Sequence, residues 1–201
     1  MVAHLRQDVS AHQNLMRYNQ SMPHIHTAPG QHDPTASAYI IRIDGDEPLL
    51  LLHKHKLLDS YLQIGGHIEL DETPWQAIVH EIKEESGYRM NQLRILQPKV
   101  RLKSITNATV HPQPAYVITH PFKGKDHYHT DAAYVFVTNE APADNVSEGE
   151  SNELRWFTDK ELDELTTDEI IENVREIGHF VMRVYLKEGE AIQTAEFGSH
   201  I

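Results

Sequence analysis

The sequence predicts an α/β protein in which helices cover both faces of a mixed β-sheet. Short β-rich segments separated by turn residues recur between residues 36 and 157. A helix with an apolar face interrupts them at residues 74–86, and a second apolar helical stripe follows them at residues 167–186. Strands mixed with one internal and one C-terminal helix fit a sheet that is covered on both sides.

Residues 1–35 are expected to form a helical arm and a linker ahead of the folded domain. Leu5, Val9 and Met16 have the spacing of a weak amphipathic helix that ends before Pro23. Histidines, prolines and a glycine then mark an irregular linker. The helix is expected either to pack on the domain or to join a partner subunit, which would make the protein a homodimer.

The folded domain, residues 36–187, is expected to contain most of its strands before the acidic stretch at residues 140–152. Segments rich in β-branched and aromatic residues predict strands at residues 36–43, 48–54, 61–64, 93–105 (one strand or a pair), 115–122, 131–138 and 154–157. The leucine run at residues 49–52 lacks alternation, which predicts a strand buried on both faces. The segments on either side of Lys123-Gly124-Lys125-Asp126 predict a hairpin.

The C-terminal part of the chain predicts helices at residues 159–165 and 167–186. The second of these carries an apolar stripe, which indicates core packing or a subunit contact. Residues 188–201 are mainly polar and are expected to form a frayed tail.

The helix at residues 74–86 has clear end signals. Asp71 or Thr73 can cap its start, Pro74 suits its first turn, and Gly87 can end it. Its apolar arc centres on Ile78 and Ile82. One face of this helix is therefore expected to pack against the core.

Three glutamates share the neighbouring face of the same helix. Glu81, Glu84 and Glu85 lie at positions i, i+3 and i+4, so their carboxylates meet and repel one another. Lys83 points away from them. A hard divalent cation with oxygen ligands would relieve the repulsion, and the carbonyl of Gly66 could complete its ligands. Taken alone, the pattern also fits an ordinary solvated acidic helix.

The spacing around these glutamates resembles the Nudix box. That box is a glycine, a glutamate six positions later, and then Arg-Glu-aliphatic-x-Glu-Glu-x-Gly-aliphatic. Residues 66–88 keep every glycine and glutamate of this pattern. Two positions depart from it, because His80 stands where the family has arginine and Tyr88 replaces an aliphatic residue.

Membership of the Nudix family implies an α/β/α sandwich and a hydrolase that cleaves a phosphoanhydride bond. The expected substrate is a nucleoside triphosphate or a nucleoside diphosphate linked to another group. The resemblance implies that Glu81, Glu84 and Glu85 bind Mg²⁺ or Mn²⁺ and take part in catalysis. A further glutamate from a later loop often helps in the family. Among Glu148, Glu150 and Glu153, we expect Glu150 to fill this role.

The resemblance gives Glu72 and His80 a supporting role. In the family the glutamate at the position of Glu72 pairs with the box arginine and braces the loop against the helix. Histidine is charged only part of the time near neutral pH, whereas arginine is a permanently charged fork. We therefore expect reduced or more pH-dependent activity with metal binding retained, although His80 can also be read as a tolerated surface substitution.

Substrate contacts are harder to assign from the sequence. Strand alternation would place His127, His129 and Asp131 on one side, where they could contact a phosphate or base or simply pack across strands. Four further residues on strands near the box are candidates: Tyr39, Arg42, Tyr61 and Gln63.

Composition excludes several other classes. The formal charge of −12 argues against a nucleic-acid partner. The absence of cysteine excludes disulfides, thiolate nucleophiles and cysteine zinc sites, and it disfavours an isopentenyl-diphosphate isomerase-like activity, which uses a cysteine in the familiar enzymes. No apolar run reaches membrane-spanning length, and the N-terminus lacks the core of a signal peptide, so a cytoplasmic protein is expected. The main alternative is a Nudix-like module that binds a nucleotide without cleaving it.

Overall fold

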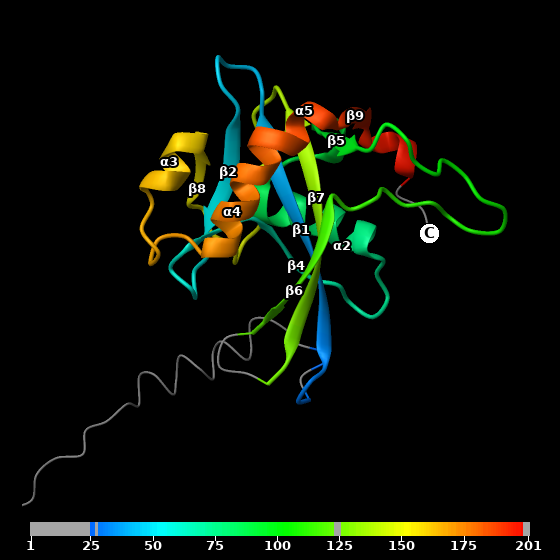
Figure 1. Cartoon of the computed structure of the whole chain (residues 1–201), viewed down its shortest axis with the longest axis horizontal. Coiled ribbons are helices and arrows are strands. Elements are labelled where there is room, and N and C mark those ends of the chain that lie inside the picture. Colours follow the sequence, from blue (N-terminus) through cyan, green and yellow to red (C-terminus); the bar gives the residue numbers. More distant parts are fainter. Residues whose placement is uncertain (1–24, 27, 123–125, 199–201) are drawn as a thin grey trace, which may run out of the picture.

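The computed structural model describes residues 25–26, 28–122 and 126–198 (Figure 1). The helical arm expected around Leu5, Val9 and Met16 lies outside the described residues, as does the tip of the predicted hairpin at residues 123–125. The described chain is an α/β fold with a mixed sheet between helices, as predicted. Among these residues, none of the helices is long and apolar enough to cross a membrane.

Two long parallel strands form the centre of the sheet. β1 (His32–Arg42) and β7 (Tyr128–Thr138) pair along their full lengths and run side by side through the molecule (Figure 1). Shorter strands pair antiparallel with these two or extend the sheet beyond them: β2 (Leu49–Lys54), β3 (Tyr61–Leu62), β4 (Ile64–His67), β5 (Arg94–Gln97), β6 (Tyr116–Pro121), β8 (Leu154–Phe157) and β9 (Glu190–Gln193). The predicted hairpin is therefore confirmed as β6–β7.

Each face of the sheet has its own apolar core. The side chains of Ala38 and Ile40 face α2 (Pro74–Ser86), whereas Tyr39 and Ile41 face the opposite side. The opposite side is covered by α3 (Asp159–Glu164), α4 (Glu172–Phe180), the π-helical turn η2 (Val181–Tyr185) and α5 (Leu186–Glu188). The leucines of β2 are shared between the two cores, as expected for a strand buried on both faces.

Three predicted elements have different limits in the structure. β1 begins at His32, so the end of the predicted linker belongs to the sheet. The strand predicted at residues 93–105 is confined to β5, and Pro98 follows directly. The helix predicted at residues 167–186 begins only at Glu172, because residues before it bind the edge of the sheet. There the amide of Tyr61 donates to the carbonyl of Glu169 (2.6 Å).

The expectation of a frayed polar tail is wrong for residues 190–198. β9 pairs with β5 over four residues, and a 3₁₀ turn (Thr194–Phe197) follows it. Ile192 is buried in the same core as α2, and Trp75 Nε1 donates to the carbonyl of Gly198 (3.3 Å). Backbone pairing with β5 positions the segment, and Ile192 and Phe197 supply its apolar contacts.

Candidate active site

The helix α2 is fixed at both ends by the residues that its sequence suggested. Thr73, rather than Asp71, is the N-cap: its hydroxyl accepts from the amide of Gln76 (3.3 Å), and the Gln76 side chain accepts from the amide of Thr73 (2.8 Å). Gly87 ends the helix in the left-handed region, at φ 68°. Such reciprocal capping satisfies amides that the first turn leaves unpaired.

The glycine pair of β4 lies directly against the glutamates of α2. The Gly65 amide donates to Glu85 Oε2 at 2.8 Å. A Cβ atom on Gly66 would overlap the carboxylate of Glu81. The Glu81 carboxylate therefore occupies the space that the missing side chain of Gly66 leaves open, and the Glu85 carboxylate is held by the Gly65 amide.

The carboxylates at this contact are buried and carry perturbed pKa values. Glu85 is 7% exposed. Burial, together with the neighbouring Glu81, raises the pKa of Glu85 well above its usual value, although the Gly65 amide opposes the change. Burial raises the pKa of Glu81 to about 7. The neighbouring His80 acts to lower this pKa, whereas Glu150 and Glu84 act to raise it. Bringing these groups together is costly in the absence of a positive charge.

His53 does not supply that charge. Its Nδ1 lies 3.6 Å from Glu85 Oε1 and it is almost fully buried. Burial and the nearby His55 lower the pKa of His53 to about 4, so it faces Glu85 as a neutral imidazole. Neutral histidine can orient a carboxylate but cannot offset its charge.

The acidic loop at residues 140–152 reaches this site through its backbone. The Ser147 amide donates to the carbonyl of Glu84 (2.7 Å), and the Asp144 amide donates to the carbonyl of Gly87 (3.0 Å). These bonds hold the loop at the C-terminal end of α2. From there Glu150 comes close enough to raise the pKa values of both Glu81 and Glu85.

The other two loop glutamates lie elsewhere. Glu153 accepts from the hydroxyl of Tyr61 (3.1 Å), and Glu148 is exposed. Glu150, by contrast, is near enough to raise the pKa values of both Glu81 and Glu85.

His80 bridges two carboxylates on the outer side of the site. Its Nδ1 lies 3.4 Å from Glu72 and its Nε2 lies 3.1 Å from Glu84. Partial burial would lower the pKa of His80, but Glu84 and Glu72 outweigh that effect and raise it. This histidine of α2 therefore contacts both the loop residue Glu72 and the helix residue Glu84.

The donor set fits a hard divalent cation. Glu81, Glu84 and Glu85 offer carboxylate oxygens on one side of α2, and the backbone of Gly66 lies against the first of them. Mg²⁺ and Mn²⁺ prefer oxygen ligands of this kind. The raised pKa values of Glu81 and Glu85 also mean that their charged forms are unfavourable unless positive charge is added.

The predicted substrate residues do not form one group. Tyr39 is buried on the far face of the sheet against Tyr116. Tyr61 packs on Phe157 in the same core. Arg42 stacks on Trp156 at the distal end of β1, roughly 20 Å along the strand from Ala36, the partner of Gly66, at about 3.3 Å per residue.

A polar patch lies near Gln63, His127 and His129, and the sequence pattern indicates only part of it. Gln63 Nε2 donates to Ser37 Oγ (3.0 Å), and the hydroxyls of Ser37 and Thr35 both donate to Asp131 (2.9 Å each). His127, His129 and Asp131 are all buried, which fits the predicted alternation. The period-two pattern Asp33-Thr35-Ser37 is the sequence signal for this patch, but it falls partly in the segment expected to form a linker.

A mixed sheet whose glycine pair faces a glutamate-bearing helix defines the class of Nudix-type pyrophosphohydrolases. The family model of the NUDIX domain matches residues 32–176, and this chain belongs to that family. The resemblance seen in residues 66–88 is therefore confirmed.

Solved structures share the fold. A NUDIX family hydrolase from Clostridium perfringens superposes with a TM-score of 0.63 and 27% identity, covering 76% of this chain and 97% of that one. An Ap4A hydrolase from C. elegans, in a binary complex, superposes with a TM-score of 0.53 and 20% identity, covering 73% of this chain and 90% of that one. The NUDIX domain of Shewanella oneidensis NrtR, complexed with ADP ribose, superposes with a TM-score of 0.54 and 11% identity, covering 76% of this chain and 88% of that one. No curated protein sequence matches this chain.

Proposed function

We propose that this protein is a divalent-metal-dependent hydrolase that cleaves a phosphoanhydride bond in a nucleotide-linked substrate. The observation that carries the proposal is the contact of the Glu81 and Glu85 carboxylates with the glycine pair of β4, with Glu150 near enough to raise the pKa values of both. Among the ion pairs of the described residues, the box carboxylates meet only the imidazoles of His80 and His53. A concentration of buried negative charge of this kind is suited to binding a cation.

In this proposal Glu81, Glu84 and Glu85, with the Gly66 carbonyl, hold Mg²⁺ or Mn²⁺. Such an ion neutralises phosphate charge and lowers the pKa of water. The Gly65 amide fixes one oxygen of Glu85, so that this carboxylate presents a defined edge to the site. In this proposal Glu150, from the loop outside the helix, accepts a proton from the attacking water.

The proposed substrate is a nucleoside with a phosphoanhydride-linked group. Two proteins of this fold support that chemistry: one is an Ap4A hydrolase, and the other is a NUDIX domain complexed with ADP ribose. The net charge of −12 would repel such a polyphosphate, and the proposed cation offsets this repulsion where the substrate binds. A nucleotide-binding module without activity is the second candidate, but the presence of every box glutamate favours the enzyme.

The test is a panel of nucleoside triphosphates, sugar nucleotides and dinucleoside polyphosphates, incubated with Mg²⁺ or Mn²⁺ and scored for released phosphate or pyrophosphate. Glu84→Gln and Glu85→Gln should each lower turnover by about 100-fold or more, since each removes a charged group from the reacting site. Glu148→Gln is the matched control and should leave turnover unchanged, because Glu148 is an exposed glutamate of the same loop as Glu150.

Nucleotide binding without turnover under either metal would contradict the enzymatic proposal and favour the binding module. Full activity of Glu84→Gln and Glu85→Gln would contradict the assignment of the site. Activity should also increase as the pH rises through about 7, because Glu81 must lose its proton before it can hold a cation.

A further inference from the structure

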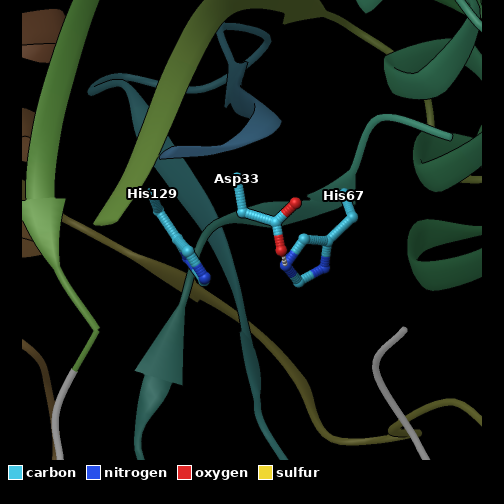
Figure 2. Close-up of side chains that lie close together, drawn as sticks. All are labelled: Asp33, His67 and His129. Carbon is cyan, nitrogen blue, oxygen red and sulfur yellow. Dashed lines mark ion pairs between the residues drawn. The ribbon is translucent and has the colours of Figure 1, made fainter. Parts of the chain in front are cut away.

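Three buried side chains from three neighbouring strands meet on the sheet face opposite α2. Asp33 lies on β1, His67 ends β4, and His129 lies on β7. Strand register brings them together: Asp33 pairs with His129, and His67 pairs with Thr35, two residues along from Asp33. Figure 2 shows the carboxylate of Asp33 between the two imidazole rings.

Their potential ligand atoms are close enough to share one ion. One oxygen or nitrogen from each residue lies within 4.8 Å of the other two. Asp33 Oδ2 and His67 Nε2 are 3.4 Å apart. Ligands at about 2.0–2.1 Å from a tetrahedral Zn²⁺ are about 3.3 Å from one another, so this pair already has the required spacing.

The surroundings favour an ordered site over a solvated cluster. Asp33 is 0% exposed, and His67 and His129 are each 8% exposed. The amides of Ile25 and His26 donate to the Asp33 carboxylate (3.2 and 3.4 Å), which orients it. Support of this type around a ligand is a regular feature of metal sites.

We propose that Asp33, His67 and His129 bind a divalent transition-metal ion of the Zn²⁺ type, separately from the glutamates of α2. Two imidazoles and one carboxylate suit ions of this borderline class, whereas Mg²⁺ prefers an all-oxygen set. Three protein ligands leave a fourth position for water or another ligand. The ion would link β1, β4 and β7 and would offset the buried charge of Asp33.

The proposal is independent of the hydrolase function, because the two sites lie on opposite faces of the sheet. Gly66 faces Glu81 on the α2 side, and the next residue, His67, points to the other side. Successive residues of a strand alternate in this way. The two metal sites can therefore be tested with separate variants.

The experiment titrates metal-stripped, tag-free, full-length protein with Zn²⁺ in excess Mg²⁺, by calorimetry and elemental analysis. One Zn²⁺ per chain is expected. Asp33→Asn and His129→Gln should each weaken that binding by more than about 100-fold, because loss of even an outer-shell partner costs about 10- to 100-fold. Glu84→Gln should keep the Zn²⁺.

His179→Gln is the matched control. His179 also contacts carboxylates, with Nδ1 2.8 Å from Asp159 and Nε2 2.9 Å from Asp163, but lies on α4 away from the cluster. It should leave Zn²⁺ binding unchanged. Retention of Zn²⁺ by Asp33→Asn and His129→Gln, or its loss from Glu84→Gln, would overturn the proposal.

A crystallographic measurement covers the case in which a variant fails to fold. Crystals of the native protein grown with Zn²⁺ should show an anomalous peak at the zinc edge between Asp33, His67 and His129. Zinc peaks confined to surface histidines or to the glutamates of α2 would overturn the assignment, leaving a buried Asp33–His67 ion pair as the role of these residues.

Discussion

His80 connects the two halves of the Nudix box through its ring nitrogens. Glu72 precedes α2, and Glu84 lies on α2 one turn after His80. Each of these carboxylates contacts a different ring nitrogen of His80. Both contacts are ionic only when the ring is protonated. Because these carboxylates raise the pKa of His80, the charged bridge persists somewhat above the usual pKa of 6.5 and is lost as the pH rises further.

Replacing His80 with arginine should therefore matter most at high pH. The rate of His80→Arg relative to the native protein is expected to rise with pH above 6.5, by up to about fivefold, the equivalent of the ~1 kcal/mol upper range for an exposed ion pair. The measurement is a pH–rate profile of both proteins under the same metal. Identical rates and profiles would show that His80 is a tolerated surface residue.

At the scale of single residues, the sequence predicted what local spacing determines. The shared face of Glu81, Glu84 and Glu85 follows from helix geometry, and the contact of His80 with Glu84 follows from their i, i+4 spacing. The cluster of Asp33, His67 and His129 depends on pairing between strands that are distant in sequence. Spacing along the chain contains no information about that pairing.

At the scale of elements, the two glycines of β4 serve different purposes. Gly65 has φ 147°, and a Cβ atom there would overlap the backbone of Ala36 and Ser37 on the neighbouring strand. The atoms nearest to a Cβ atom on Gly66 would instead belong to the end of the Glu81 side chain. The first glycine permits close packing of strands, and the second permits the approach of a carboxylate.

Alanine substitutions should separate these roles. Gly65→Ala is expected to lower the free energy of unfolding by about 1–3 kcal/mol or more, since backbone cannot move as easily as a side chain. Gly66→Ala should change stability little but displace Glu81 and weaken Mn²⁺ binding. Denaturant unfolding and calorimetry measure the two effects.

Gly45→Ala provides the control for these substitutions, because its Cβ would meet only a carbonyl at 3.9 Å. Equal loss of stability in Gly65→Ala and Gly66→Ala would contradict the division of roles.

Element limits were predicted well where end signals are local and less well where tertiary contacts decide. Thr73 and Gly87 fix α2 within a few residues of chain. The start of α4 depends instead on the pairing of Tyr61 with Ile170, two segments far apart in sequence. Ile170 belongs to the apolar stripe but pairs with the sheet, so the stripe predicts a longer helix than the structure contains.

At the scale of the whole molecule, the last described residues complete the sheet and one core. β9 adds a strand beyond β5, and Ile192 enters the core beneath α2. Phe197 packs on Trp75, which itself stacks on Phe136 at the centre of the sheet. The C-terminal segment therefore supports the helix that carries the glutamates.

Ile192→Ala should lower the free energy of unfolding by about 2–4 kcal/mol, the usual cost of truncating a buried isoleucine. Gln193→Ala, at the exposed neighbouring position, should stay within about 0.5 kcal/mol of the native value. Thermal and denaturant unfolding of both variants are the measurements. A negligible effect of Ile192→Ala would mean that the segment from Glu190 onward is dispensable for the core.

The fold class was predictable because both cores obey simple periodicity, with leucines in β2 and apolar arcs in the helices. The role of residues 190–198 was not predictable, because their sequence is polar and their place depends on an unpaired edge of β5. A backbone edge can recruit almost any sequence, so composition does not reveal such a strand.

The acidic loop touches α2 through main-chain atoms at Asp144 and Ser147. These main-chain hydrogen bonds do not depend on the side chains of Asp144 and Ser147. Point substitutions that spare Asp144, whose carboxylate also pairs with Arg89 at 2.7 Å, should therefore leave Glu150 in position. Inserting or deleting a residue between Ser147 and Glu150 would instead shift the carboxylate away, so the length of this segment is more constrained than the composition of its exposed positions.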